Sequence, residues 1–341
     1  MTELQARPIL ALGGGPFAVQ EWQVICGRYE IDTIPRAELT DRASVIKAIA
    51  AAVATRAAAG KPPYVALILF LGLSSFRPFN ENVLGPLTKN GCRLICGGGT
   101  GYDFVDIDWL TSQGVLYCNT PTAFTVSTAN GALMLILAVT RAASQSEMYV
   151  KAGKWRGDAS LPAGVLPLGH DIEGMTLPKL DVFGCQVIYH SRRRVPESEE
   201  NGARYVSMDE LLAVSDVISV NCPLTPETRH LLGPAAFFKM KTGVFVVNTA
   251  RGPIIDEDAL VEALRSGKVS RVALDVFERE PIIHPGLLDP SLSHRVTFQP
   301  HMTGVTVQGC VKGELELLKS LEEFLEGGRP EYAVNLIDSS G

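Results

Sequence analysis

The stretch Val244-Phe245-Val246-Val247-Asn248-Thr249-Ala250-Arg251-Gly252 joins an apolar strand directly to polar residues and a glycine. Two later strands end in the same way, at Asp275-Val276-Phe277-Glu278-Arg279-Glu280-Pro281 and at Gln299-Pro300-His301. Ligands of open α/β sheets bind beyond the carboxyl ends of the strands. The three strand ends are therefore expected to converge on one crevice.

Strand-like and helical runs alternate along the chain around this stretch. The predicted strands are residues 8–12, 31–34, 64–70, 93–96, 115–118, 185–190, 217–221, 244–248 and 272–276. The helices predicted between them include residues 18–29, 42–59, 207–213, 234–240 and 257–266. Such alternation predicts an α/β fold with parallel sheets flanked by helices. We expect two doubly wound parallel-sheet domains.

The length of 341 residues also suggests two domains. Asn119-Thr120-Pro121 is typical of a hinge, which predicts a first domain of residues 1–119 plus 305–341 and a second of residues 120–304. Residues 127–143 are predicted to form one helix that is apolar almost all round, as suits an element buried between domains. The last helix, residues 307–327, is expected to pack on the first domain. Its predicted apolar face carries Leu315, Leu317, Leu318, Leu321 and Phe324.

Composition excludes several classes of protein. With 31 basic and 37 acidic side chains the net charge is −6, which argues against nucleic-acid binding driven by charge. The longest apolar run, residues 132–139, is far shorter than the roughly 20 residues of a membrane helix. The seven cysteines include no CxxC pair, so neither disulfides nor a metal site are expected. We expect a soluble, cytoplasmic protein without a membrane or nucleic-acid partner.

The strand ends supply an arginine, Arg251, a carboxylate, Glu280, and a histidine, His301. Interconversion of an alcohol and a carbonyl beside a carboxylate needs an acid/base near neutral pH, which suits histidine. It also needs a carboxylate to orient that histidine, a cation to bind the substrate's acid group, and a cofactor to carry the hydride. Each residue alone could instead be a surface or turn residue. Their occurrence together favours a catalytic site.

Several motifs in order resemble the D-isomer-specific 2-hydroxyacid dehydrogenases, in particular their fungal glyoxylate/hydroxypyruvate reductase and D-mandelate dehydrogenase-like branch. The resemblance covers nearly the whole chain. The motifs are Gly99-Thr100-Gly101-Tyr102-Asp103, Asn119-Thr120-Pro121, Asn221-Cys222-Pro223-Leu224-Thr225, Val247-Asn248-Thr249-Ala250-Arg251-Gly252 and Leu274-Asp275-Val276-Phe277-Glu278. The resemblance implies a flavodoxin-like substrate domain followed by a Rossmann-like cofactor domain.

The same resemblance implies a role for each matching residue. Arg251 would bind the acid and carbonyl of the substrate, His301 would be the acid/base, and Glu280 would orient it. The amides of Thr100 and Gly101 would hold the substrate's carboxylate. The cofactor-binding positions would be Asp275, at the nicotinamide ring, with Thr128, Cys222, Pro223, Thr228, Thr249 and Ala250. A homodimer is also implied, with residues 127–143 and the following loop at the subunit contact.

The family's first strand, glycine turn and helix are not visible in the second domain. A stretch like residues 169–177 leads into that unit in the family, but here Leu177 is followed by Pro178 and then by Phe183-Gly184. The gap is about a dozen residues of the roughly 30-residue βαβ unit. Because the missing strand lies centrally in a sheet ordered 3-2-1-4-5-6, its neighbours would lose their partner. We therefore expect a Rossmann-like domain without its first strand, turn and helix.

Two other stretches bear on the cofactor. Gly13-Gly14-Gly15-Pro16-Phe17-Ala18 follows a strand and has Asp32 downstream, but Pro16 lacks an amide where a phosphate needs one, which favours a plain substrate-domain loop. Arg192 and Arg193 stand where an NAD enzyme places an acidic residue, so NADP is favoured over NAD. A solvated basic loop is the alternative.

The sequence thus predicts an NAD(P)-dependent oxidoreductase that interconverts a small 2-oxo acid, such as glyoxylate or hydroxypyruvate, and a D-2-hydroxy acid. Two alternatives follow from the missing unit. One is a cofactor-impaired, non-catalytic relative that keeps the acid-binding cleft. The other is a sequence that lacks a short coding segment.

Overall fold

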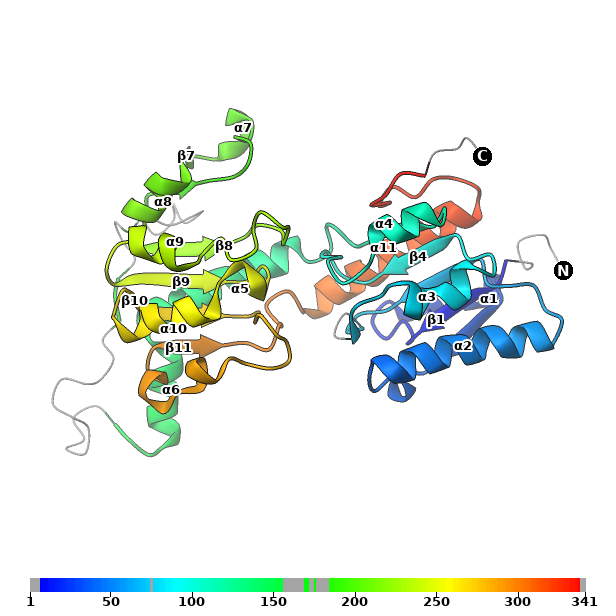
Figure 1. Cartoon of the computed structure of the whole chain (residues 1–341), viewed down its shortest axis with the longest axis horizontal. Coiled ribbons are helices and arrows are strands. Elements are labelled where there is room, and N and C mark those ends of the chain that lie inside the picture. The colour runs from blue at the N-terminus through cyan, green and yellow to red at the C-terminus, as the bar shows by residue number, and fades with distance from the viewer. Residues whose placement is uncertain (1–6, 74–75, 156–168, 172–174, 176–183, 338–341) are drawn as a thin grey trace. The chain divides into compact units, whose positions relative to one another are not determined.

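The computed structural model describes residues 7–73, 76–155, 169–171, 175 and 184–337 (Figure 1). The chain separates into two compact units. Residues 1–127 together with 304–341 form the N-terminal unit, and residues 128–303 form the second unit. The boundary falls within the long helix α5 (Thr125–Arg141). Each unit is built around its own parallel sheet.

The N-terminal unit contains a five-stranded parallel sheet with the order β2-β1-β3-β4-β5. Its strands are β1 (Ile9–Leu12), β2 (Ile31–Ile34), β3 (Ala66–Leu69), β4 (Leu94–Gly97) and β5 (Leu116–Cys118). In register, Ile9 is the partner of both Ile31 and Ala66. The strand order reverses direction between β1 and β3, which is where open α/β sheets form ligand crevices. The predicted doubly wound, flavodoxin-like sheet is confirmed.

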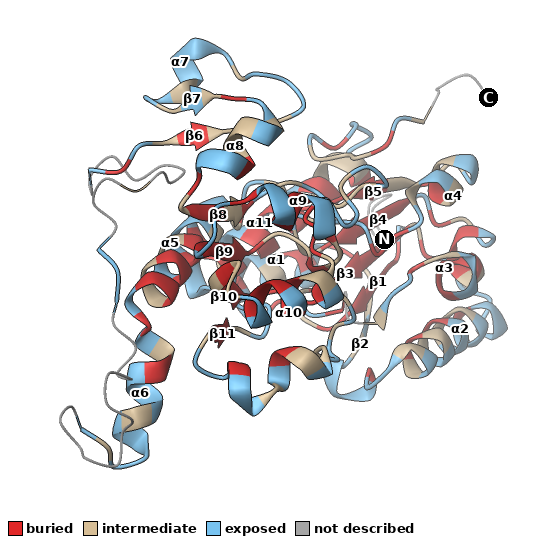
Figure 2. Ribbon diagram, turned by 60° about the vertical axis from the view of Figure 1, so that its left-hand side comes forward, coloured by how far each residue is buried: buried red, intermediate tan, exposed pale blue. Residues whose placement is uncertain are grey.

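Helices cover both faces of this sheet. They are α1 (Val19–Arg28), α2 (Arg42–Ala58), α3 (Glu81–Thr88), α4 (Ile107–Ser112) and α11 (Val307–Leu325), with a short 3-10 helix, η2 (Arg36–Glu38). Neighbouring residues of a strand point to opposite faces. Accordingly, Ile9 packs in one core with Leu321 of α11, whereas Leu10 packs in another with Ile49 of α2. Figure 2 shows the buried strands in red, with exposed outer faces on the helices.

The last helix, α11, packs on the N-terminal sheet as predicted, but its buried face differs from the predicted one in one position. Leu317, Leu318 and Leu321 are buried against the sheet, whereas Leu315 is 39% exposed. Leu315 comes two residues before Leu317 and three before Leu318. Because residues two apart lie on different sides of a helix, Leu315 is at the edge of the apolar face.

The second unit contains a four-stranded parallel sheet with the order β11-β10-β9-β8 and a separate parallel pair, β6-β7. The strands are β6 (Ile188–Tyr189), β7 (Arg204–Tyr205), β8 (Val217–Val220), β9 (Val244–Asn248), β10 (Val269–Leu274) and β11 (Val296–Phe298). Among the described residues no strand joins β6 to β8, which is where the missing first strand of a Rossmann sheet belongs. The junction of Leu177 and Pro178 lies outside the described residues.

The helices of the second unit follow its strands in the alternation typical of α/β folds. They are α6 (Ala143–Lys151), α7 (Glu197–Glu200), α8 (Met208–Val214), α9 (Pro234–Lys239) and α10 (Glu257–Arg265). Short 3-10 helices, η5 (Gly252–Ile254), η6 (Pro285–Leu288) and η7 (Pro290–Leu292), shape the loops after β9 and β10. Asp256 is the N-cap residue directly before α10, and its side chain accepts the N–H of Ala259 and caps the first turn.

The helix predicted for residues 127–143 is α5, which ends two residues earlier than predicted, and a second helix, α6, follows it directly. The α5 helix ends at Arg141, Ala142 adopts a left-handed φ of 52°, and α6 continues at an angle of 67°. Leu135 and Val139 of α5 pack against Phe245 of β9 in the core of the second unit. No helix among the described residues can span a membrane by itself; α5 and α6 reach the required length and apolarity only as this bent pair.

Candidate active site

Arg251 stands in a turn at the carboxyl end of β9 that Asn248 shapes. The Asn248 side chain accepts the N–H of Ala250 at 3.0 Å and donates to the carbonyl of Arg251 at 3.0 Å. The next residue, Gly252, lies directly against the chain after β10, because an added Cβ would come within 2.0 Å of the Phe277 carbonyl. Only glycine permits this approach, so Gly252 holds the Arg251 turn next to the segment that carries Glu280.

Glu280 and His301 form a hydrogen-bonded pair. Nδ1 of His301 lies 3.0 Å from Oε2 of Glu280, and Oε1 of Glu280 accepts the N–H of Phe277 at 3.0 Å. The carboxylate is therefore fixed on both sides. Since Nδ1 faces Glu280, Nε2 is the ring nitrogen that faces away from the carboxylate, as an acid/base for a substrate requires.

The backbone at His301 is strained and firmly held. His301 has a φ of +58°, which costs a non-glycine residue energy and is found preferentially at functional sites. Its N–H donates to the carbonyl of Asp275 at 2.8 Å. The buried Asp275 carboxylate also accepts the N–H of Met302 at 2.7 Å and both the N–H and the hydroxyl of Thr303. Asp275 thus fixes the loop that carries His301, a contact that the sequence did not suggest.

A second histidine–carboxylate pair lies in the same unit. Nε2 of His230 is 3.0 Å from Oε1 of Glu278, and Nδ1 is 3.9 Å from Asp256. Both ring nitrogens of His230 therefore face carboxylates, and neither faces a position for a substrate. This difference separates His230 from His301, although both histidines have a carboxylate partner.

One of the predicted cofactor-binding side chains has an unused polar atom. The hydroxyl of Thr249 is buried and has no hydrogen-bond partner within the described chain, an arrangement that favours a ligand partner. By contrast, the Thr228 hydroxyl accepts the N–H of Thr225 and donates to the carbonyl of Pro223, each at 2.7 Å, so it shapes the turn 223–228. Ala250 is held by Asn248, and Thr128 stands in the first turn of α5.

Arg192 brings positive charge near the turn 223–228. A hydrogen bond from Thr225 and, more weakly, the charge of Arg192 lower the pKa of Glu227. At Cys222 burial outweighs the charge of Arg192 and raises the pKa of the thiol. A neutral thiol is a suitable apolar wall for a cofactor ring. Arg193 contributes its carbonyl to the same loop, where it accepts the hydroxyl of Ser191 at 2.6 Å. These groups fit the adenosine end of a dinucleotide, and Thr249 with the Asp275 loop fits the nicotinamide end.

Thr100 and Gly101 lie in the N-terminal unit, after β4. The Thr100 hydroxyl and carbonyl are tied to Thr120 and Asn119 at 3.1 and 2.6 Å. The amides of Thr100 and Gly101 donate to no acceptor in the parts of the chain that the structure describes. Two unpaired amides in a glycine-containing turn form an anion-binding position. The described residues of either unit contain no cluster of three or more side chains that could bind a metal.

Comparisons with known proteins agree with this geometry. The family model described as D-isomer specific 2-hydroxyacid dehydrogenase, NAD binding domain, matches residues 133–303. A protein of Schizosaccharomyces pombe described as a 2-hydroxyacid dehydrogenase is 39% identical over 98% of both chains. Two solved structures are similar over nearly the whole chain. A glyoxylate reductase from Paecilomyes thermophila has a TM-score of 0.83 at 34% identity, covering 96% of this chain and 98% of its own. The D-mandelate dehydrogenase of Rhodotorula graminis has a TM-score of 0.82 at 27% identity, covering 97% and 98%.

The fold, the site and these likenesses define a nicotinamide-dependent oxidoreductase. The chain belongs to the D-isomer-specific 2-hydroxyacid dehydrogenase family, whose enzymes interconvert 2-oxo acids and D-2-hydroxy acids with NAD(P). The predicted family, fold class and type of reaction are confirmed.

Proposed function

We propose that Arg251, Glu280 and His301 are the catalytic group for the reduction of a small 2-oxo acid such as glyoxylate or hydroxypyruvate. Bound NAD(P)H supplies the hydride. His301 gives a proton from Nε2 to the carbonyl oxygen, and in the reverse direction takes it from the hydroxyl. Glu280 holds Nδ1 and stabilises the charged imidazole. The observation that carries the proposal is the 3.0 Å contact between His301 and Glu280 on a strained, braced loop.

The Arg251 guanidinium is the group that would bind the substrate's carboxylate and carbonyl, because its planar fork of donors matches their geometry. The Thr100 and Gly101 amides of the N-terminal unit are a separate candidate position for a carboxylate. The test is oxidation of NADPH or NADH by purified protein with a panel of 2-oxo acids. Absence of turnover with every acid in the panel would refute the proposal.

We further propose that NADP is preferred over NAD. Arg192 and Arg193 follow β6, and the charge of Arg192 acts on the turn 223–228 next to the proposed adenosine end. An arginine binds the 2′-phosphate of NADP with two hydrogen bonds and a charge interaction. It has no such charge interaction with the uncharged ribose hydroxyls of NAD, which an acidic residue normally binds. The nicotinamide end would be held by Asp275 and Thr249. Comparing kcat/KM for NADPH and NADH in the wild type and in Arg192→Ala tests this preference.

Among the described residues no strand joins β6 to β8, and this favours a second candidate, a relative that binds the acid but binds the cofactor poorly. The glycine turn of the missing unit normally brings backbone amides and a helix N-terminus to the pyrophosphate. Calorimetry separates the two candidates: tight NADPH binding supports the enzyme, and acid binding without NADPH binding supports the relative. Resequencing the transcript across the codons for Leu177 and Pro178 tests whether a coding segment is missing.

We also propose that the protein is a homodimer located in the cytoplasm. Large apolar side chains are exposed on α5, α6 and the chain just after them, and such a face suits a subunit contact. They are Met134, Met148, Val150 and Trp155, exposed by 46 to 70%. Light scattering after size exclusion tests the dimer, and a fluorescent fusion observed in cells tests the location.

A further inference from the structure

The left-handed backbone at His301 turns the amides that follow it toward one carboxylate. His301 has a φ of +58°. The next two N–H groups, of Met302 and Thr303, donate to the buried carboxylate of Asp275 at 2.7 and 3.2 Å. Successive amides that converge in this way form an anion-binding concavity. The anion here is a side chain of the protein, so the strained backbone of His301 is maintained by the Asp275 carboxylate.

Thr303 also donates its hydroxyl to the same carboxylate. The hydroxyl binds Oδ2 of Asp275, whereas the N–H of Met302 binds Oδ1, so both oxygens are held. Asp275 is only 1% exposed, and a buried carboxylate needs several hydrogen bonds to remain charged. Among its donors in the described part of the chain, the Thr303 hydroxyl alone belongs to a side chain. A substitution can therefore remove this donor and leave the backbone amides in place.

Thr303 also rests on the helix α5, at Gly131. A Cβ added at Gly131 would lie 2.5 Å from Cβ of Thr303 and 2.8 Å from its carbonyl oxygen. Glycine within a helix is less stable than alanine, and Gly131 lies inside α5 without a positive φ. The close approach of Thr303 is a physical reason for a glycine at this position. Thr303 is thus enclosed between α5 and the Asp275 carboxylate.

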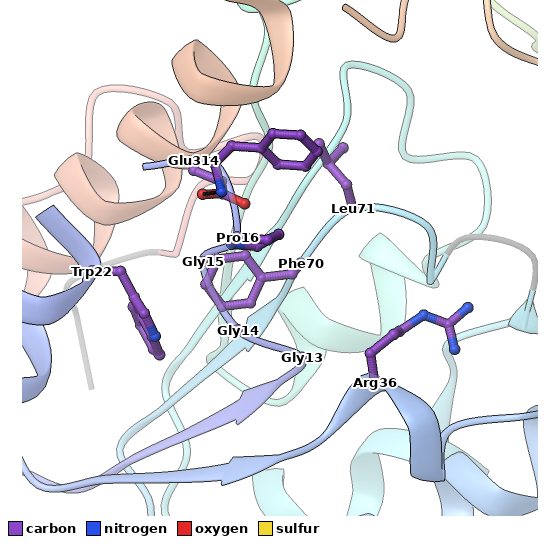
Figure 3. Close-up of a pocket in the computed structure, with 10 residues that line it drawn as sticks. Gly13, Gly14, Gly15, Pro16, Trp22, Arg36, Phe70, Leu71 and Glu314 are labelled. Atoms are coloured by element: carbon purple, nitrogen blue, oxygen red, sulfur yellow. Dashed lines mark hydrogen bonds between the residues drawn. The ribbon is translucent and has the colours of Figure 1, made fainter. Parts of the chain in front are cut away.

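A buried carboxylate in the N-terminal unit holds two amides without a hydroxyl. Glu314 of α11 borders a hollow beside Trp22, together with the glycine turn 13–15 (Figure 3). Its carboxylate, 1% exposed, accepts the N–H of Phe17 at 3.0 Å and that of Ala18 at 2.6 Å. Neither Phe17 nor Ala18 has a positive φ. Two amides are enough at this unstrained loop, so the added hydroxyl and the positive φ distinguish the loop that carries His301.

We infer that Thr303 is a positioning residue for the proposed acid/base, His301. The Thr303 hydroxyl holds the Asp275 carboxylate against the two amides, and the contact with Gly131 fixes the loop against α5. Together these contacts keep the backbone of His301 left-handed and its Nδ1 at Glu280, 3.0 Å away. The inference rests on the proposed function, because Thr303 has a part in the reaction only if His301 transfers the proton.

The first test removes the hydroxyl and keeps the shape of the side chain. Thr303→Val is expected to lower kcat for reduction of a 2-oxo acid by about tenfold or more, since a small displacement of an acid/base group has a large effect on the rate. KM for the acid and for NADPH should change less than about threefold, because the hydroxyl binds Asp275 rather than a ligand. Thr303→Ser keeps the hydroxyl and is expected to retain kcat within about threefold of the wild type.

Thr140→Val is the matched control for this test. Thr140 is fully buried on α5, and its hydroxyl donates to the carbonyl of Ile136 at 2.8 Å, so the same change removes a buried hydrogen bond outside the His301 loop. Its kcat should stay within about twofold of the wild type. Urea unfolding shows whether the variants are folded under the assay conditions.

Wild-type kcat in a folded Thr303→Val protein would overturn the inference, and so would equal losses in Thr303→Val and Thr303→Ser. A wild-type protein without turnover would instead refute the proposed function. In that case the position of the His301 ring is tested without turnover.

The second test therefore observes the ring directly. Nitrogen NMR spectra of the histidine rings show which nitrogen carries the proton, and His301→Gln identifies the signals of His301. At about pH 8.5, where an ordinary histidine is neutral, we expect the proton on Nδ1 in the wild type and in Thr303→Ser. Thr303→Val should lose this preference, because Nδ1 no longer faces Glu280. An unchanged His301 spectrum in Thr303→Val contradicts the inference, whether or not the protein is active.

Gly131→Ala tests the contact with α5 and serves if Thr303→Val does not fold. The new Cβ must displace Thr303, so kcat is expected to fall about threefold or more. Gly27→Ala on α1 is the control, because no atom lies within 4 Å of its added Cβ, and its kcat should be unchanged. Wild-type kcat in Gly131→Ala would show that the contact does not position His301 and would refute the inference.

Discussion

Nδ1 of His301 lies 3.0 Å from Oε2 of Glu280, and the backbone N–H of Phe277 holds the other oxygen of that carboxylate at the same distance. Glu280 is thus fixed before a substrate arrives. A prepositioned carboxylate stabilises the imidazolium form of the histidine that gives up the proton during reduction. The pair therefore sets the direction of the ring.

Replacing Glu280 by Gln is expected to lower kcat for reduction by about ten- to a hundredfold, because the amide no longer carries the negative charge that orients and stabilises the proton-donating imidazole. Steady-state kinetics with saturating NADPH and 2-oxo acid measures kcat. Glu278→Gln is the control, because Glu278 pairs with His230. An unchanged kcat in Glu280→Gln would contradict the assigned role.

Replacing Arg251 by Lys is expected to raise KM for the 2-oxo acid by about ten- to a hundredfold. A lysine keeps the charge but offers no planar pair of donors, and the loss corresponds to roughly 1.5–3 kcal/mol. Steady-state kinetics with saturating NADPH measures the effect. Arg229→Lys, at the exposed partner of Glu278, should leave KM unchanged. Equal KM values in Arg251→Lys and the wild type would remove Arg251 from the substrate site.

Replacing Gly252 by Ala is expected to destabilise the protein by about 1–3 kcal/mol and to reduce activity with it. The new Cβ would lie 1.9 Å from the carbonyl carbon of Phe277, so the Arg251 turn and the Glu280 segment must move apart. Urea unfolding and kcat together measure this. The control is Gly27→Ala, which meets no atom within 4 Å and should be neutral or slightly stabilising. A fully stable and active Gly252→Ala protein would show that the close approach is not needed.

Local sequence was informative about the strands, because buried parallel strands are continuous apolar runs such as β3 and β9. It also indicated which polar residues follow those runs. The break at Ala142 was not predictable, since neither glycine nor proline marks its left-handed backbone. The bracing of the His301 loop by Asp275 and the hollow beside Trp22 were not predictable either. They depend on side chains brought together from distant parts of the chain, which periodicity does not reveal.

The buried Glu314 carboxylate gives a prediction about stability and pH. Burial raises the pKa of Glu314, and the amides of Ala18 and Phe17 offset this only in part. Because its pKa is higher in the folded than in the unfolded protein, the folded state binds the proton more readily. The free energy of unfolding therefore falls as pH rises from about the ordinary glutamate value, near 4.3, through the raised one.

Glu314→Gln removes this titration but keeps an oxygen that can accept the two amides. The stability of the variant relative to the wild type is therefore expected to increase between pH 4 and pH 7. Urea unfolding at several pH values measures the difference. Glu322→Gln, on the same helix and paired with Arg28 at the surface, controls for the loss of a negative charge. Only a group whose proton affinity changes on folding makes the free energy of unfolding depend on pH. If the difference in this free energy between Glu314→Gln and the wild type stays constant with pH, burial of the ionised Glu314 carboxylate does not destabilise the protein.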